Sequence, residues 1–282
     1  MTTRLRTAVN ILLRRRSWPV PAPARPSSLE EQVFEALVRP GDVVFDIGAS
    51  TGATTVFFGR LAGSSGRVYA FEPVPSTYEA LCAGLQKDTY EKAPICTLPF
   101  GLADSGGVRD ISRPRDQSEL ASLVLSEHVA GSGAPITTER VLFVTLDEIV
   151  ADWRLPLPNV VKIDVEGAEL LVLRGAERVL RDATPIVHLE VFAPWLRSFN
   201  LTPWDVLSHL RRFGYEFLFT CAAGLIEHDP TVEAPFPPDF LVGYNVIGLI
   251  PQTHAAAHPR LMKLRPGHGP LLPLAPPPMR NQ

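Results

Sequence analysis

Acidic residues and one histidine lie at or near the ends of four apolar runs, and their types suit proton transfer. Asp46, Glu72 and Asp164 each lie at such a position, and His188 and Glu190 lie in a fourth run. Carboxylates and imidazoles can take up protons or accept hydrogen bonds from hydroxyl groups. The carboxyl ends of parallel strands meet at one edge of a sheet, so we expect these side chains to converge on one crevice.

A glycine turn follows the first apolar run. Residues 43–47 read as a strand buried on both faces because the run does not alternate, and Gly48 and Gly52 allow a tight bend into a helix. Such a turn suits ribose, phosphate or amino-acid carboxylate groups. Two glycines alone also fit an ordinary strand-to-helix turn.

Glu72 favours a nucleoside cofactor at this turn. It follows the run at residues 67–71, where a carboxylate can accept both hydroxyls of a ribose. Its distance along the chain from Gly48 is typical of nucleotide-binding folds. A charge exposed at the start of a loop is the alternative.

The later polar residues also have structural explanations. Asp164 and Glu166 would place negative charge at the N-terminus of the next helix, which needs no chemistry. His188 and Glu190 share a strand face, so both could reach one pocket. A buried histidine, however, commonly has a structural partner such as Glu190.

Strands and helices alternate through residues 41–220, which predicts a doubly wound parallel sheet with helices on both faces. Capping boxes predict helices that start at Ser76 and at Thr145. Residues 105–139 show little periodicity and predict a lid or an insertion. The expected strands are 43–47, 67–71, 95–100, 141–146, 160–164, 185–191, 215–220 and 244–250.

Length and composition predict one domain with extensions. The domain is expected at residues 28–250, after a basic leader and Pro-rich linker at residues 1–27. Residues 251–282 hold eight prolines and predict a disordered tail. Residues 1–30 hold six arginines against one glutamate, while the whole chain has a net charge of −3. The acidic body argues against nucleic-acid binding.

The three cysteines and the termini bear on location and partners. Cys82, Cys96 and Cys221 lack metal-ligand spacing, which indicates a reducing, cytoplasmic compartment. No apolar run is long enough to span a bilayer. Weak peripheral membrane contact by the leader is one interpretation of its arginines, and a solvated leader is the other. A homodimer is the commonest soluble assembly.

Four blocks together resemble the FkbM family of S-adenosylmethionine-dependent methyltransferases. They occur in the family's order and the resemblance covers about residues 41–192. Ser50 departs from the family pattern, which usually has Asn there. The blocks are residues 46–52, Phe71-Glu72-Pro73, Thr145-Leu146-Asp147 and residues 162–169.

The resemblance implies a class I methyltransferase fold, Rossmann-like, with a seven-stranded sheet whose last strand is antiparallel. It also implies S-adenosyl-L-methionine as cofactor and a small molecule, sugar or secondary metabolite that is methylated on a hydroxyl. The implied cofactor residues are Gly48, Ala49, Ser50 and Gly52 around the methionine end with Asp46 below, Glu72 at the ribose, and Leu102, Ala103 and Asp104 near the adenine.

A sulfonium methyl is already electrophilic, so catalysis needs in-line placement of the nucleophile and removal of its proton. Our hypothesis places Asp164 and Glu166 on the acceptor side, with Glu190 or His188 as the base or its orienting partner. A divalent cation among the carboxylates would be another way to activate a hydroxyl, but no motif such as HExxH supports it.

Two other functions are compatible with the sequence pattern. An NAD-dependent oxidoreductase would use the same kind of sheet, but the turn lacks the GxGxxG spacing. A catalytically idle methyltransferase-like binding module would use the terminal extensions as contacts, and Ser50 is the feature that favours it.

Overall fold

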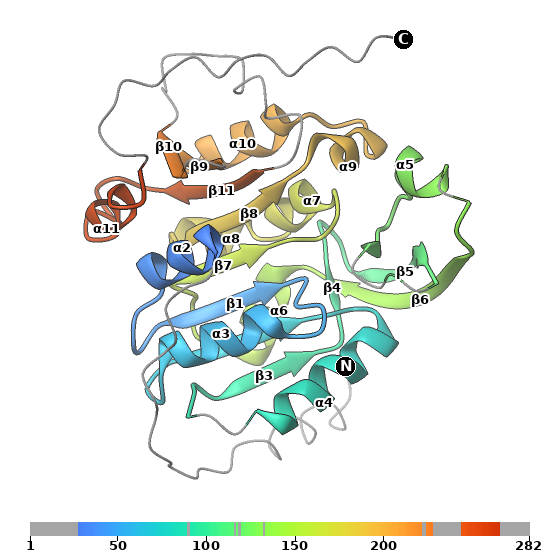
Figure 1. The fold of residues 1–282 in the computed structure, drawn as a ribbon, viewed down its shortest axis with the longest axis horizontal. Helices are drawn as coiled ribbons and strands as arrows, with labels where there is room; N and C mark the ends of the chain where they lie inside the picture. The colour runs from blue at the N-terminus through green and yellow to red at the C-terminus, as the bar shows by residue number, and fades with distance from the viewer. Residues whose placement is uncertain are drawn as a thin grey trace.

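The computed structural model describes residues 28–88, 91–115, 117, 120–131, 133–221, 224–227 and 244–265. The predicted leader and linker at residues 1–27 lie outside the described residues, as does the part of the predicted tail after residue 265. A large twisted sheet lies at the centre of the described chain, with helices on both of its faces (Figure 1).

The large sheet has eight strands in the order β10-β9-β11-β8-β7-β1-β2-β3. Strands β3, β2, β1, β7 and β8 are parallel, whereas β11 runs antiparallel between β8 and β9. The doubly wound sheet with an antiparallel last strand is thereby confirmed, and β10 adds one strand to the seven expected. The bounds are β1 Val43–Ile47, β2 Arg67–Phe71, β3 Ile95–Leu98, β7 Val160–Ile163, β8 Ile186–Val191, β9 Glu216–Cys221, β10 Gly224–Glu227 and β11 Tyr244–Leu249.

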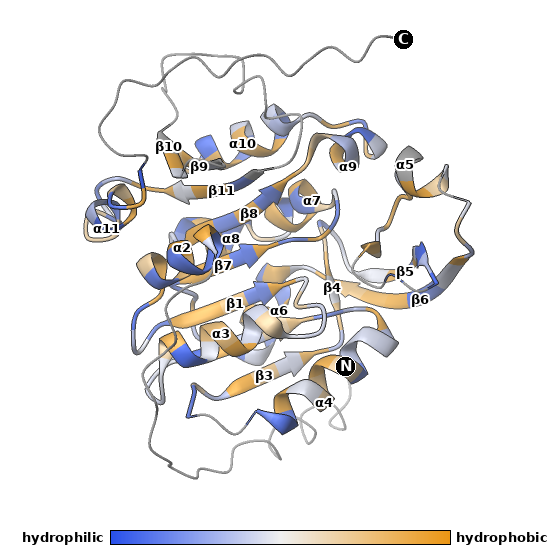
Figure 2. Ribbon diagram, in the orientation of Figure 1, coloured by the Kyte–Doolittle hydropathy of each residue, from blue (hydrophilic) through white to orange (hydrophobic). Residues whose placement is uncertain are grey.

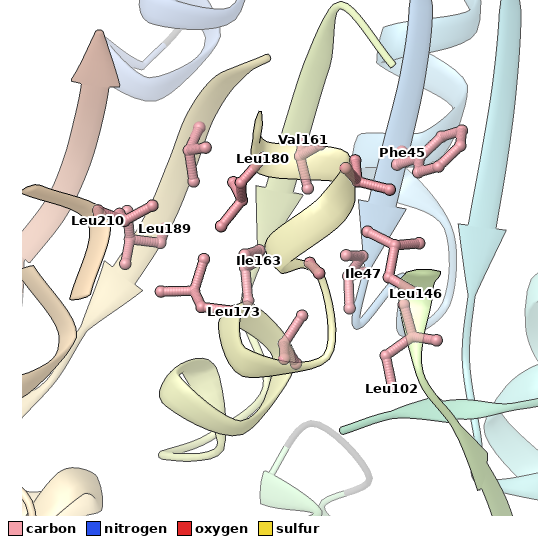
Figure 3. Packing of buried hydrophobic residues seen from close by; sticks show 14 of the residues in the cluster. Phe45, Ile47, Leu102, Leu146, Val161, Ile163, Leu173, Leu180, Leu189 and Leu210 are labelled. Atoms are coloured by element: carbon pink, nitrogen blue, oxygen red, sulfur yellow. The ribbon is translucent and has the colours of Figure 1, made fainter. Parts of the chain in front are cut away.

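Apolar side chains divide the helices between two cores, one on each face of the sheet. Alternate residues of each strand feed one core or the other, as Val44 and Phe45 do in β1. Figure 3 shows part of the larger core from close by. This core packs α6 (Leu146–Trp153), α7 (Glu169–Arg174), α8 (Glu177–Asp182) and α10 (Pro203–Arg211) on the sheet, while α2 (Leu29–Leu37), α3 (Ala53–Ala62), α4 (Pro75–Lys87) and α11 (His258–Met262) pack on the opposite face.

Hydrophilic residues enter the apolar strands near their carboxyl ends. Figure 2 shows orange β1 and β7 turning blue toward their arrowheads. In β1 this residue is Asp46 and in β7 it is Lys162, both buried. Buried charged groups in the middle of a sheet require oppositely charged or hydrogen-bonding partners.

A second, three-stranded sheet stands beside the large one (Figure 1). It consists of β4 (Gly101–Leu102), β5 (Gly107–Pro114) and β6 (Ile136–Val144), and α5 (Glu127–Ala130) lies between β5 and β6 along the chain. The predicted strand at 141–146 thus begins at Ile136, inside the segment expected to lack regular structure. The first half of β6 has no apolar pattern in the sequence, because β5 and this part of β6 bury few side chains.

Three further details test the predicted elements. The capping box at Thr145 is confirmed by a 3.1 Å hydrogen bond from the Glu148 amide to Thr145 Oγ1. The capping box at Ser76 is wrong: α4 begins one residue earlier at Pro75, whose fixed φ favours the first helical position. The disordered-tail prediction is wrong for residues 251–265, because α11 docks on α2 and Arg260 Nε donates to the Ala36 carbonyl at 2.7 Å.

Short α9 (Ala193–Ser198) follows β8 at the carboxyl edge of the sheet. Within the part of the chain that the structure describes, no helix has both the length and the apolar character needed to cross a membrane.

Candidate active site

A cavity of about 280 Å³ opens at the carboxyl ends of β1, β2 and β7, and the small sheet closes one side of it. The first strand end contributes the glycine turn, the second contributes an acid, and the third contributes the acidic block. The lining residues among those expected from the sequence are Gly48, Ser50, Glu72, Leu102, Asp164 and Glu166.

Gly48 brings the ends of β1 and β7 together. Its φ is +77°, and a Cβ atom built there would lie 1.8 Å from the Asp164 carbonyl oxygen. Its amide donates to the Phe71 carbonyl at 3.0 Å, which ties the turn to the end of β2 as well. Only glycine fits this position, because any side chain would push the two strand ends apart.

Glu72 supports the rest of the turn. The Ser50 amide donates to Glu72 Oε2 at 3.0 Å, and the Val74 amide donates to Glu72 Oε1 at 2.9 Å. Burial raises the pKa of Glu72 to about 7, against the lowering effect of these two hydrogen bonds. Each oxygen keeps a second lone pair, so the carboxylate can still accept hydroxyl groups from a ligand in the cavity.

Ser50 has a φ of +48°, in the left-handed region that Asn tolerates better than Ser. The family preference for Asn at this position therefore has a backbone explanation. Serine in place of Asn therefore adds backbone strain at this position. The hydrogen bond from the Ser50 amide to Glu72 does not depend on the side chain and is present.

Asp46, Ala49 and Gly52 do not line the cavity. Asp46 is fully buried, and Thr55 Oγ1 donates to its Oδ2 at 2.6 Å. Ala49 packs with Leu81, and Gly52 starts α3 with a φ of +92°. These three residues hold the turn in shape.

The predicted adenine-side segment reaches the cavity through Leu102 alone. Ala103 is fully buried, and its amide donates to the Val144 carbonyl at 3.1 Å. Asp104 pairs at 3.1 Å with Arg109 of β5. The structure therefore does not bring Ala103 and Asp104 into the cavity, because the chain turns there into the small sheet.

Three carboxylates from two strand ends form a compact group. One oxygen from each of Asp164, Glu166 and Glu190 lies within 4.8 Å of the others. Burial, and then the charge of Asp164, raises the pKa of Glu166 to about 9 and that of Glu190 to about 8. Such groups can hold or release a proton near neutral pH. An acidic group alone does not establish a cation site, and we assign no step to a metal.

His188 does not join this group. It is 1% exposed, and its ring lies 4.7 Å from that of Phe34 on α2. It shares a strand face with Glu190, as predicted, but it lies one step back from the edge, where α2 covers it. The prediction that His188 reaches the pocket is wrong for this reason.

Three residues of the site were not singled out in the sequence. Lys162 donates to the Gly48 carbonyl at 2.8 Å, and Ser122 donates to the Glu166 carbonyl at 2.7 Å. Glu169 accepts the amides of Val165 and Gly167 on Oε1. A lysine inside an apolar strand is a signal that could have revealed Lys162, whereas Ser122 lies in a segment without a pattern.

The fold is a doubly wound α/β sheet, and its cavity joins the glycine turn and Glu72 to the acids that follow β7. The model of the methyltransferase FkbM domain matches residues 46–217, which is more than half of the chain. The chain belongs to this family.

Two curated proteins are similar in sequence. The hexuronic acid methyltransferase AglP of Haloferax volcanii is 31% identical over 163 residues, which is 56% of this chain. The 31-O-demethyl-FK506 methyltransferase FkbM of Streptomyces tacrolimicus is 30% identical over 166 residues, which is 50% of this chain. The aligned part spans 61% of each relative's own length.

Solved structures also match. A methyltransferase FkbM from Methylobacillus flagellatus is 18% identical with a TM-score of 0.46, over 76% of this chain and 47% of that one. Fibrillarin of Aeropyrum pernix, solved with S-adenosyl-L-methionine, is 14% identical with a TM-score of 0.40, over 78% and 73% of the two chains.

Proposed function

We propose that this protein is an S-adenosylmethionine-dependent methyltransferase that methylates a hydroxyl group of a small molecule or sugar. One observation carries the proposal: a single cavity joins the glycine turn and Glu72 to the carboxylates of Asp164 and Glu166. The first pair fits a nucleoside cofactor, and the second pair fits an acceptor that must lose a proton.

The residues present suit this cofactor. Gly48 and Ser50 offer small residues at a strand end, and Glu72 keeps lone pairs for ribose hydroxyls. Ala49, Gly52 and Asp46 would support them from outside the cavity lining, and Leu102 would lie near the adenine, whereas Ala103 and Asp104 have no direct contact in this assignment. When bound, the cofactor supplies a methyl group on a sulfonium, which needs no further activation.

The acceptor side would place the hydroxyl and take its proton. Burial and the neighbouring Asp164 keep the pKa values of Glu166 and Glu190 well above their ordinary range, which matches a base that works near pH 8. We assign the proton to this pair, with Asp164 as the charge that tunes it. His188 has no role in this assignment, because its ring lies under α2.

The charges around the cavity favour a hydroxyl over a carboxylate acceptor. Glu72, Asp164 and Glu166 are the ionisable side chains among the described residues that line it. A carboxylate acceptor would meet like charge, whereas a neutral hydroxyl finds hydrogen-bond acceptors. One relative is named for a hexuronic acid and the other for 31-O-demethyl-FK506. The two names do not decide between a hydroxyl and a carboxylate acceptor, so the proposal rests on the charges of the cavity.

Calorimetry tests the cofactor assignment. We expect S-adenosylhomocysteine to bind and NAD not to bind, and Glu72→Gln to weaken S-adenosylhomocysteine binding at least about tenfold, since one charged hydrogen bond is worth about that much. Binding of NAD in its place would favour an oxidoreductase. Absence of both would favour an idle binding module.

Turnover tests the acceptor side. With a hydroxyl acceptor, Glu190→Gln or Glu166→Gln should lower kcat by about 100-fold or more if it removes the base. His188→Leu serves as the contrast and should affect stability more than kcat. Full turnover in both glutamate variants would contradict the assignment.

We also propose a cellular location, the bounds of the domain and an assembly state. The free thiols of Cys82 and Cys96 support a reducing, cytoplasmic location. The described residues support one domain from residue 28 through β11, extended by α11. The basic leader and its contact with a membrane lie outside the described residues, and a homodimer remains the expectation for assembly.

A further inference from the structure

Lys162 is the basic group at the centre of the site. It lies in β7 and is 6% exposed, with Asp46 of β1 and His188 of β8 as its register partners. A lysine in a strand that is covered on both faces is retained only where oxygen atoms compensate for its lost hydration.

Three oxygens compensate for it, and they belong to different parts of the site. Lys162 Nζ donates to the Gly48 carbonyl at 2.8 Å and lies 3.2 Å from Asp164 Oδ2 and 3.5 Å from Asp46 Oδ1. The Gly48 carbonyl accepts a hydrogen bond from the ammonium, and the two carboxylates form ion pairs with it. Gly48 belongs to the cofactor turn and Asp164 to the acceptor side.

Among the residues that the structure describes, the remaining ionisable neighbours of Lys162 include no second cation. Burial and the charge of Lys162 lower the pKa of His188 to about 3, so this imidazole is neutral at working pH. The other ionisable groups that interact electrostatically with Lys162 are acids, namely Glu30 on α2, Glu72 after β2, and Glu166 and Glu190. Although burial opposes it, Asp164 and Asp46 raise the pKa of Lys162.

We propose that Lys162 is a positioning residue that couples the two halves of the site. It holds the carbonyl of the glycine turn against the Asp164 carboxylate, so the cofactor turn and the acceptor-side acids keep one fixed separation. The inference rests on the proposed function, because a fixed separation matters where two reactants must lie in line.

Its charge has a second effect on the acceptor side. Lys162 lowers the pKa values of Glu166 and Glu190 against the raising effects of burial and Asp164. Loss of the ammonium should therefore move the titration of these carboxyl groups to higher pH, an effect that packing alone would not produce.

Lys162→Met tests both effects, because it keeps the length of the side chain and removes the charge. We expect S-adenosylhomocysteine to bind at least about tenfold more weakly by calorimetry. We also expect the Glu190 carboxyl signal in glutamate-labelled protein, assigned with Glu190→Gln, to titrate at higher pH. Lys162→Arg keeps the charge and should restore the wild-type titration and the larger part of the affinity.

Lys92→Met is the matched control. Lys92 Nζ lies 3.1 Å from Asp88 Oδ2, and neither residue lines the cavity. This variant should change neither measurement. If Lys162→Met does not fold, Asp46→Asn/Lys162→Met is compared with Asp46→Asn, because the double variant removes the buried acid together with its cation.

A folded Lys162→Met that binds within about twofold of wild type and leaves the Glu190 titration unchanged overturns the inference. A wild-type protein that does not bind S-adenosylhomocysteine contradicts the proposed function instead. The Glu190 titration then decides the role of Lys162 without reference to the cofactor.

Discussion

Gly48 and the acids around it show how few atoms hold this site together. One missing Cβ atom allows the ends of β1 and β7 to touch, and one carboxylate, Glu72, fixes two amides of the adjoining loops. Glu166 adds a φ of +54°, which a non-glycine residue adopts at a cost. The residues of the site are therefore held in conformations that the isolated segments would not prefer.

Gly48→Ala should destabilise the protein by about 3 kcal/mol or more, because its Cβ would overlap the Asp164 carbonyl. Urea unfolding measures this loss. Gly214→Ala is the control: its φ of +88° is also positive, but nothing lies within 4 Å of the added atom. That control should lose only about 1 kcal/mol. Equal losses would show that backbone strain, not the contact with β7, decides the effect.

Glu190→Gln should increase stability at high pH. The folded-state pKa of Glu190, about 8, lies above the ordinary value of 4.5, so the folded protein binds more protons between these two values. Stability therefore falls as the pH rises through this window, and Gln removes the loss. We expect a gain of about 1 to 3 kcal/mol near pH 9 and almost none near pH 4.

Urea unfolding at both pH values measures this difference for Glu190→Gln. Glu216→Gln, on an exposed position of β9, is the control and should change little at either pH. A gain that is the same at both pH values would contradict the electrostatic explanation.

At the scale of the elements, the small sheet and its connections decide the shape of the cavity. Residues 121–123 line the cavity, and the 2.7 Å hydrogen bond from Ser122 to the Glu166 carbonyl fixes them there. Two backbone hydrogen bonds between Ser112 and Ser122 connect the segment to β5. Contacts to the acceptor should therefore depend on this segment.

Ser122→Ala should release the segment. The side chain is 1% exposed, and its loss leaves the Glu166 carbonyl without this donor, at a cost of about 1 to 2 kcal/mol. Amide hydrogen exchange should increase at residues 120–124 and around Glu166. Ser208→Ala, whose hydroxyl bonds only within its own helix at an exposed position, should leave these amides unchanged. Unchanged exchange in Ser122→Ala would show that the segment is held by other contacts.

For the whole molecule, the C-terminal part of the described chain completes the fold. Leu261 of α11 is fully buried in the core that also contains Phe34 and Leu37 of α2. Arg260 caps the end of α2 by donating to the Ala36 carbonyl. The same α2 covers His188 through Phe34. Helix α11 therefore stabilises α2, which covers His188, although the two helices are more than 200 residues apart in sequence.

Leu261→Ala tests this contribution. Loss of a fully buried leucine side chain should cost about 2 to 5 kcal/mol, measured by urea or thermal unfolding. Leu157→Ala, at a leucine that is 47% exposed, is the control and should cost much less. Equal costs would mean that α11 contributes little to the core.

The sequence by itself determined the sheet, the glycine turn and the group of acids at the strand ends. These features are local: an unbroken apolar run such as residues 43–47 specifies a central strand, and Gly48 specifies a turn, whatever lies around them. Parallel strands then bring Glu72 and Asp164 to one edge without further information.

Tertiary structure alone decided which of these side chains meet. His188 and Glu190 share one strand face, yet α2 covers the first and leaves the second beside Asp164. The apolar strand marks Lys162 as unusual, but only the fold shows that its ammonium contacts the Gly48 carbonyl and Asp46. Such contacts join residues more than 100 positions apart, and local propensity and periodicity carry no information about them.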